Sequence, residues 1–325
     1  MKRAGYWRNV WWEFRKNRLA VAGLGVIIAL IVLAALAPLV ANNRPYVYIA
    51  EGGVYFPLFY DHAEIRGRDL RKDDFRGFKI FPPIPYSYSE YNLDEILVGP
   101  SLRHVMGTDE QGRDLAARMV HGTQVSLLVG FIAVAIYISI GIVIGALAGF
   151  YGGWVDMVIS RFIEMVMCFP TFFLILTILA LWGPSMVSVM VVIGITGWPG
   201  VARIVRGEFL KLREMDFVTA SRALGSRDWR IILRHMLPNS MAPVLVSASF
   251  GVASTILIES SLSFLGLGVQ PPTPSWGQIL SNSSQYIDFA WWMTLIPGFA
   301  IFLTITSYNL IGEGFQEAID PKARK

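Results

Sequence analysis

The stretch FVTASRALGSRDWRIILRHMLPN, residues 217–239, is a strongly polar segment in a chain that otherwise consists largely of hydrocarbon side chains. Between Arg203 and Arg234 there are eight Lys or Arg residues and four Asp or Glu residues. The 325-residue chain is 54% apolar and 16% charged, with a mean hydropathy of +0.49. These values lie outside the usual range of soluble domains and indicate an integral membrane protein. The quoted stretch is therefore expected to lie outside the bilayer.

Six apolar runs are each long enough to cross about 30 Å of hydrocarbon as an α-helix. They are Leu19 to Ala41, Val125 to Gly149, Phe162 to Trp182, Met186 to Ala202, Met241 to about Leu265, and Ala290 to Leu310. The first run is too long for the apolar part of a secretory signal, and Pro38 follows its candidate cleavage site. The expected fold class is an all-α membrane protein with six transmembrane helices.

Basic residues set the expected orientation of these spans. Six Lys or Arg residues precede the first span, and short basic flanks stay in the cytoplasm. With alternating spans, the segment 203–239 and the tail with Lys322, Arg324 and Lys325 also fall on the cytoplasmic side. The loop 266–289, which contains no Lys or Arg, falls outside. We expect a multi-pass protein of the cell (inner or cytoplasmic) membrane with both termini in the cytoplasm.

Several kinds of chemistry have no motif in this chain. No GxxxxGK[ST] is present, which excludes ATP hydrolysis by a P-loop within this chain. HExxH, CxxC and GxSxG are absent, the four histidines are scattered, and Cys168 is the single cysteine. Basic residues cluster beside apolar runs, which favours membrane contact over nucleic acid. We therefore expect a non-catalytic membrane protein with no cofactor, no bound metal and no nucleic-acid partner.

The quoted stretch predicts two short helices joined by a glycine. Asp216 is expected to cap a helix over residues 217–224, and Gly225 to end it. Ser226 is expected to cap a second helix that ends near Pro238. The apolar sets at helical spacing are Phe217, Ala220 and Leu224 in the first helix and Trp229, Ile232, Leu233 and Met236 in the second. Such a hairpin suits docking onto another protein, and the alternative is a solvated basic loop.

This hairpin resembles the cytoplasmic EAA loop of ABC importer permeases, in which EAAxxxG is followed nine residues later by IxLP. The matching positions are Ala220, Gly225, Leu237 and Pro238. The departures are Thr219 in place of the acid, Ser221 in place of an alanine and His235 in place of the isoleucine. A threonine offers a hydrogen bond but no charge, a difference of about 1 kcal/mol at an exposed rim.

Four further stretches resemble the C-subunits of oligopeptide and dipeptide permeases. They are GTDEQGRDLAARMVHGTQVSLLVG (107–130), GFYGGWVDMVISRFIEMVMCFPT (149–171), GWPGVARIVRGEFLKLREMDFVTASRALG (197–225) and LSFLGLGVQPPTPSWGQIL (262–280). With the C-terminal GEGFQEAIDP, the resemblance covers most of residues 107–321. Parts of residues 42–92 are similar to the longer outer segment of permeases for microcin-C-like peptides.

The resemblance implies a type I ABC importer permease fold with a small extracytoplasmic insertion between the first two spans. The implied partners are ABC ATPase subunits, a second homologous permease subunit, an extracytoplasmic substrate-binding protein and the lipid bilayer. The implied function is binding-protein-dependent import of peptides, although relatives also carry nickel complexes or opines. The residues implied to couple transport to the ATPase are Asp216, Phe217, Thr219, Ala220, Ser221, Leu224, Gly225, Leu237 and Pro238.

The expected organisation of the chain has five parts. They are a basic, amphipathic N-terminus (1–18), the first transmembrane span (19–41), an extracytoplasmic segment (42–118), a permease core (119–312) that includes the coupling loop (203–239), and a cytoplasmic tail (313–325). The outer segment is rich in aromatic residues and would either dock the binding protein or shield the mouth of the pathway.

Three features of the spans leave two interpretations open. Gly141, Gly145 and Gly149 repeat every four residues, which predicts close helix packing inside this subunit or between subunits. The third span is expected to be interrupted at Pro170 and the fourth at Trp198-Pro199-Gly200, either as hinges or as packing accommodations.

Two sets of acidic residues also invite a functional interpretation. Glu259 is expected near the outer face within reach of water or of a partner, as a pathway residue that contacts a substrate amine or as a structural residue. Asp109, Glu110 and Asp114 lack the order of an EF-hand and predict helix capping or docking of the binding protein.

Two other classes of protein would explain the same spans. A proton-driven secondary peptide carrier is one, but such carriers place several ionisable groups within the membrane, and few occur here. A membrane scaffold without transport is the other. Loss of uptake on deletion, and its dependence on ATP or on the proton gradient, would separate the three classes.

Overall fold

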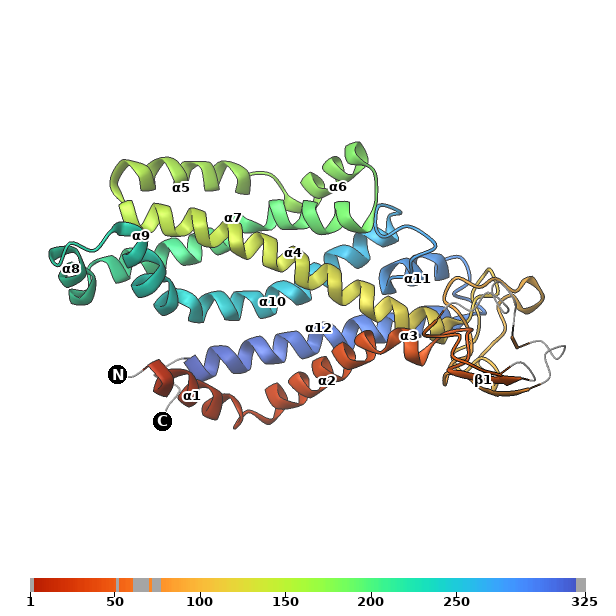
Figure 1. The fold of residues 1–325 in the computed structure, drawn as a ribbon. Helices are drawn as coiled ribbons and strands as arrows, with labels where there is room; N and C mark the ends of the chain where they lie inside the picture. The colour runs from red at the N-terminus through yellow and green to blue at the C-terminus, as the bar shows by residue number, and fades with distance from the viewer. Residues whose placement is uncertain (1–2, 51–52, 61–69, 72–76, 320–325) are drawn as a thin grey trace. The chain divides into compact units, whose positions relative to one another are not determined.

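The computed structural model describes residues 3–50, 53–60, 70–71 and 77–319, and its helices and strands are shown in Figure 1. The tail residues Lys322, Arg324 and Lys325 lie outside the described residues, as does part of the predicted outer segment. The chain divides into two compact units. Unit 1 comprises Met1–Ile27, Val129–Ile258 and Leu303–Lys325, and unit 2 comprises Ile28–Leu128 and Glu259–Phe302.

Five helices among the described residues are long and apolar enough to cross a membrane. They are α2 (Arg18–Ala35), α4 (Leu115–Tyr151), α7 (Met186–Arg213), the continuous helix Asp228–Phe264 that ends in α10 (Leu237–Phe264), and α12 (Trp291–Ile319). A sixth span is obtained if α5 (Gly153–Met167) and α6 (Thr171–Trp182) are counted together. The predicted count of six therefore depends on a broken span.

The break in that span occurs where the sequence predicts it. Helices α5 and α6 are bent by 76° to each other, and Pro170 occupies the position just before α6 with extended backbone angles. Proline has no N–H for the helical ladder, and the residue before it avoids helical geometry. The predicted interruption at Pro170 is confirmed.

The predicted interruption of the fourth span at Pro199 is wrong. Helix α7 runs unbroken from Met186 to Arg213 with Pro199 inside it. One proline removes one backbone hydrogen bond, and tight packing of the flanking side chains offsets that loss in membrane helices. Val201, Ala202 and Val205 are indeed fully buried or nearly so. The polar segment 203–239 consequently begins as the last turns of a span.

The packing of α7 is explained by the glycine stripe of α4 within unit 1. A Cβ added to Gly141 would lie 2.7 Å from Val201 Cβ, and one added to Gly145 would lie 2.5 Å from the carbonyl oxygen of Ala202. At Gly149 the nearest atom would be Phe209 Cβ, at 2.5 Å. All three distances are shorter than real Cβ contacts, so only glycine permits the two backbones to approach this closely.

The N-terminal helix α1 (Arg3–Phe14) packs through its C-terminal end in unit 1. Phe14 is fully buried, and its ring lies 4.6 Å from that of Phe315 in α12. Asn17 donates a 2.8 Å hydrogen bond to Glu317. Trp7, Trp11 and Trp12 are exposed, as expected of a helix that lies in a membrane interface.

Unit 2 contains a small sheet that the all-α expectation missed. Strands β1 (Val47–Ala50), β2 (Gly53–Tyr55) and β3 (Phe78–Ile80) form an antiparallel sheet in the order β2-β1-β3. In this sheet Tyr48 pairs with Tyr55 and Ala50 with Gly53. The sequence VYIAEGGVY is a typical hairpin signal, because apolar residues with high strand propensity flank a turn that contains glycine.

The remaining elements of unit 2 are short. They are α3 (Ala37–Val40), η1 (Leu93–Glu95) and α11 (Trp276–Ser283). Ser275 precedes α11 and its hydroxyl accepts a hydrogen bond from the backbone N–H of Gln278, a typical N-cap. The loop 266–289 therefore contains a helix, and its Trp276 side chain is 1% exposed.

Candidate functional site

The polar segment between α7 and α10 contains the first of the two predicted helices, with a shifted start. Helix α8 spans Asp216–Ala223 and its N-cap is Met215, which makes no side-chain capping bond. The prediction that Asp216 is the cap is wrong, because Asp216 is already the first helical residue. Its negative charge still lies in the first turn, where its attraction to the positive end of the helix dipole stabilises the helix.

Gly225 ends α8 as predicted. It has a φ of +72°, its N–H donates to the carbonyl of Arg222 at 2.9 Å, and the next N–H, that of Ser226, donates to the carbonyl of Ser221 at 3.1 Å. This pair of bonds is a Schellman motif, which requires a left-handed residue. A Cβ at Gly225 would meet nothing within 4 Å, so the requirement for glycine comes from the backbone angle and not from space.

The second predicted helix has a different start and end. It starts at Asp228 with Arg227 as N-cap, so Ser226 is not the cap. It also passes through Pro238 into the span, because α9 (Asp228–Arg230), the π-helical turn η2 (Ile231–Met236) and α10 are continuous. The N–H of Leu237 bonds to the carbonyl of Ile232, five residues back. This widened turn accommodates the ring of Pro238, which would clash with a regular α-helical ladder.

The apolar side chains of this segment divide into a buried and an exposed set. Val218, Ile231 and Met236 are fully buried and anchor the two helices. Leu224 is 86% exposed and Phe217 is 37% exposed. Trp229 and Leu233 are also exposed. The apolar face predicted for the second helix is therefore partly buried, at Met236, and partly exposed, at these two residues. Thr219 and Ala220 are exposed, whereas Ser221, Leu237 and Pro238 are partly buried.

Helix α8 is also held against the corner between α4 and α5, a contact that the sequence did not predict. The guanidinium of Arg222 lies 5.0 Å above the ring of Phe150, which is 3% exposed. Beside it, Arg213 donates a 3.4 Å hydrogen bond to the carbonyl of Tyr151. These residues are more than sixty positions apart, so no local pattern could have found the contact. Movement of α8 would therefore act on α4 and α5 as well as on α10.

An ion pair also links α5 to α7. Asp156 of α5 accepts two hydrogen bonds from Arg206 of α7, one of them 2.8 Å long from Nη2. A bidentate pair of this kind is geometrically specific and stronger than a single contact. It ties α5 to the last turns of α7, immediately before α8.

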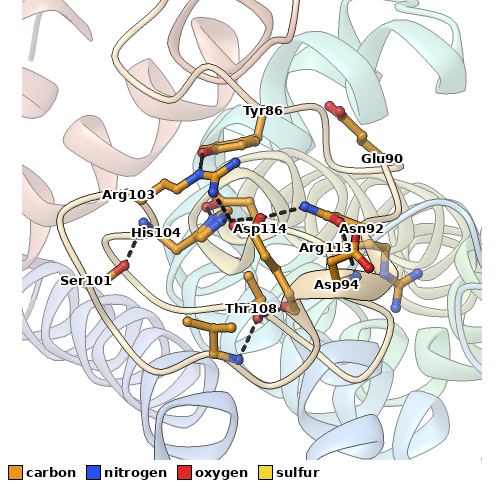
Figure 2. Close-up of polar contacts among 12 residues, drawn as sticks. Tyr86, Glu90, Asn92, Asp94, Ser101, Arg103, His104, Thr108, Arg113 and Asp114 are labelled. Carbon is orange, nitrogen blue, oxygen red and sulfur yellow. Dashed lines mark hydrogen bonds and ion pairs between the residues drawn. The ribbon is translucent and has the colours of Figure 1, made fainter. Parts of the chain in front are cut away.

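A second group of polar residues lies in unit 2, before and at the start of α4 (Figure 2). His104 is 3% exposed, and its Nδ1 lies 2.7 Å from a carboxylate oxygen of Asp114 while its Nε2 lies 3.2 Å from Glu95. Arg103 pairs with Glu95 and donates to the hydroxyl of Tyr86. That hydrogen bond and the charge of Glu95 raise the pKa of the Arg103 guanidinium. We call this group the outer polar cluster.

The acidic residues of GTDEQGRD have structural partners in unit 2. Asp114 immediately precedes α4, and its carboxylate accepts a 2.7 Å hydrogen bond from the backbone N–H of Ala117, which confirms helix capping. Asp109 accepts 2.6 Å and 2.9 Å bonds from the side chain and backbone of Arg113. Within the described ranges, no group of three His, Cys, Asp or Glu side chains could hold a metal ion.

Glu259 in unit 2 is more deeply buried than the sequence predicts. It is fully buried, and one carboxylate oxygen accepts a 2.8 Å hydrogen bond from Ser263, one turn later. The sequence leaves water or a partner open for this carboxylate, and the structure gives it a partner. Helix α11 packs close to the same stretch, since a Cβ at Gly277 would lie 2.5 Å from the Cα of Ser260. Its role as a substrate contact remains a prediction.

Two families of known proteins match parts of this chain. Residues 141–325, more than half of the chain, match the model of the binding-protein-dependent transport system inner membrane component. Residues 5–60 match the N-terminal transmembrane domain of oligopeptide transport permease C. The chain belongs to the family of binding-protein-dependent transport permeases. The resemblance drawn from the sequence motifs is thereby confirmed.

Relatives of this permease match between about three quarters of the chain and almost its whole length. The dipeptide transport system permease protein DppC of Alkalihalophilus pseudofirmus is 37% identical over 98% of this chain and 90% of that protein. DppC of Bacillus subtilis is 33% identical over 98% of this chain and 87% of its own length. The glutathione transport system permease protein GsiD of Pectobacterium atrosepticum is 38% identical over 74% of this chain and 80% of its own length.

Solved structures support the fold of this permease. A structure of the MetNI methionine ABC transporter matches with a TM-score of 0.53 at 16% identity, over 63% of this chain and 98% of that chain. At this level of identity the similarity shows the fold alone. The permease therefore has the fold of the membrane-spanning subunits of ABC importers.

Proposed function

We propose that this permease is one of two membrane subunits of an ATP-driven importer of peptides in the cytoplasmic membrane, with both termini in the cytoplasm. The carrying observation is α8, an anchored helix that exposes Phe217 in its first turn and Leu224 at its C-cap, in a chain without a P-loop. A transporter subunit that cannot bind nucleotide by that motif needs an ATPase partner, and an exposed apolar pair on a rigid helix suits a docking surface.

The proposed coupling element comprises Asp216, Phe217, Thr219, Ala220, Ser221, Leu224, Gly225, Leu237 and Pro238. In this proposal the exposed residues of α8 contact the ATPase, and Gly225 sets the angle between α8 and the next helix. A push on α8 is transmitted to α10 through η2 and to the α4–α5 corner through Arg222 and Phe150. The exposed Thr219 contributes a hydrogen bond at most, so docking depends on shape and apolar contact.

Peptides are the proposed substrate because relatives that match 98% of the chain are named dipeptide transport permeases. A glutathione permease is also among the relatives, and glutathione is itself a small peptide. Nickel complexes and opines remain alternatives. A separate extracytoplasmic binding protein is the proposed source of selectivity, and the segment 42–118, with its sheet and the outer polar cluster, is its proposed docking region.

Purification of the chain from its native membrane tests this proposal. We expect an ATPase and a second, related permease to co-purify with it. Peptide uptake by cells should be lost on deletion of the chain and on ATP depletion. Isolation of the chain alone with full, ATP-independent uptake that collapses with the proton gradient would instead support a secondary carrier. Unchanged uptake after deletion would support a scaffold.

A further inference from the structure

Unit 1 contains two adjoining cavities whose lining has a distinctive chemistry. The first has a volume of about 330 Å³ and lies among α4, α6, α7 and α10. The second has a volume of about 590 Å³ and is lined by α7, α10 and the end of α12. Ile204, Ser247 and Phe250 line both cavities. The two cavities share this part of their lining along α7 and α10, and together we call them the α7–α10 groove.

The residues that line the groove recur at helical spacing. On α10 they include Ser247, Gly251 and Ser254, which lie on one face three to four positions apart. On α7 they include Ile193, Gly197 and Ile204. One continuous face of each helix therefore borders the groove over several turns. This arrangement is a built feature of the helix pair and not an isolated packing defect.

No Asp, Glu, Lys, Arg or His side chain lines either cavity. The polar groups are instead neutral: the hydroxyls of Thr171, Thr196, Ser247, Ser254, Thr255 and Tyr137, and the amide of Gln316. A hydroxyl can both donate and accept a hydrogen bond. The surface can therefore bond to uncharged polar groups of either kind, and it has no preference for the sign of a charge.

Tyr137 of α4 occupies a gap left by two glycines at the back of the groove. Its ring atom Cδ1 lies 3.1 Å from where a Cβ on Gly197 would be, and a Cβ on Gly251 would overlap its hydroxyl. Tyr137 is 7% exposed, and the structure gives its hydroxyl no hydrogen-bond partner among the residues that it describes. Tyr137 lines the first cavity and its hydroxyl is not among the fully buried unpaired atoms of the described residues, so this group can bond to whatever enters the cavity.

We propose that the α7–α10 groove is the surface that the backbone of a translocating peptide contacts, and that the Tyr137 hydroxyl hydrogen-bonds to a peptide group there. This inference rests on the proposed function and adds a site to it. Every peptide carries N–H and C=O groups that need partners on leaving water. A neutral, hydroxyl-bearing surface offers such partners to all peptides, whatever the charge of their side chains.

Lipid and a helix of the second permease are the other possible occupants of the groove. Thiol labelling of the assembled transporter distinguishes them, with Cys168→Ser as background and Ser254→Cys as the probe. Ser249→Cys is the matched control, because Ser249 lies on the same helix outside the groove and bonds to the carbonyl of Leu245. We expect a water-soluble maleimide to label Ser254→Cys, and tri-alanine delivered by the binding protein to reduce labelling there only.

Two outcomes of that labelling would overturn the proposal. Labelling of Ser254→Cys by a membrane-soluble maleimide alone would identify lipid in the groove. Absence of labelling by either reagent would identify a packed helix. As a control, the wild-type transporter must first import tri-alanine with ATP. If it does not, the proposed function is wrong, and the labelling result does not count against the inference about the groove.

Transport assays test the chemistry of the groove directly. Tyr137→Phe removes only the hydroxyl, and we expect a loss of about twofold to tenfold in transport rate, equal for Ala-Lys-Ala, Ala-Glu-Ala and tri-alanine. Ser254→Asp should change the ratio of Ala-Lys-Ala to Ala-Glu-Ala uptake by about tenfold in favour of the cation. Ser249→Asp should leave that ratio unchanged. Unchanged rate in Tyr137→Phe together with an unchanged ratio in Ser254→Asp would contradict the inference.

Discussion

At the scale of single residues, Gly225 shows how a backbone angle can decide the position of a whole helix. Its φ of +72° closes the Schellman motif of α8, and no atom would obstruct a side chain there. A left-handed conformation costs most residues about 1–2 kcal/mol, whereas asparagine tolerates it. Gly225 therefore allows an experiment in which side-chain size and backbone strain are separated.

We predict that Gly225→Val uncouples ATP hydrolysis from uptake, whereas Gly225→Asn retains coupling. Valine is β-branched and disfavours the left-handed region, so α8 would leave its native angle. The measurement is the number of peptides imported per ATP hydrolysed in vesicles that contain equal amounts of each variant. Equal coupling in Gly225→Val and wild type would show that the turn does not transmit work.

The glycine stripe of α4 permits a second residue-scale test. Gly145→Ala should lower the free energy of unfolding of the purified protein by about 1–3 kcal/mol, because the added Cβ would lie 2.5 Å from the backbone oxygen of Ala202. Gly207→Ala on α7 is the matched control, since a Cβ there would meet nothing within 4 Å. Helix propensity alone favours alanine by about 1 kcal/mol at both sites. Equal stability changes in both variants would refute the packing argument.

Asp114 provides the corresponding test in unit 2. We predict that Asp114→Ala destabilises the start of α4 by about 3 kcal/mol or more, because it removes both the helix cap and the partner of a buried histidine. Asp94→Ala is the control, because Asp94 is exposed and its carboxylate makes no hydrogen bond or ion pair to the described residues of unit 2. Hydrogen exchange at Ala117 and Arg118 would report the loss; equal protection in both variants would contradict it.

At the scale of elements, α8 is the part of the chain for which docking is most directly testable. We predict that Leu224→Asp reduces co-purification of the ATPase at least tenfold, because a charge replaces an exposed apolar anchor. Leu102→Asp is the matched control: Leu102 is fully exposed in unit 2 and has no role in the proposed coupling element. An ATPase yield that falls equally in both variants, or in neither, would remove α8 from the docking surface.

The elements also show what the sequence can and cannot predict. Local rules found the end of α8 at Gly225 and the break at Pro170, because each depends on the backbone angles of one residue. The same rules failed at Pro199 and Pro238, where packing in α7 and the widened turn η2 carry the helix through a proline. Pairs such as Arg206 with Asp156 bring together residues fifty positions apart, and no periodicity in one sequence reveals them.

The depth of burial was the least predictable property of the candidate sites. For Glu259 the sequence left water or a partner open, because only its distance from the end of a run could be estimated. Its burial depends on α11, which folds back from a loop with no strong apolar pattern. Conversely, the exposed set on α8 followed from spacing, because a short amphipathic helix outside the bilayer leaves few places to bury Leu224.

At the scale of the whole molecule, we propose a membrane subunit that takes the energy for transport from a partner, because the chain contains no P-loop. In this proposal its spans and the glycine stripe supply a scaffold, the α7–α10 groove contacts the peptide, and α8 is the docking surface. The central claim is therefore that transport by this chain requires ATP hydrolysis on another subunit. The energy of that hydrolysis reaches the spans through α8.

Reconstitution into vesicles with the co-purified permease, ATPase and binding protein tests that claim most directly. Radiolabelled tri-alanine would be offered on the binding-protein side with ATP on the other, with and without a proton gradient. The account predicts uptake that needs ATP, is indifferent to the gradient and is abolished by Leu224→Asp but not by Leu102→Asp. Uptake without ATP, or full ATP-driven uptake in Leu224→Asp, would contradict it.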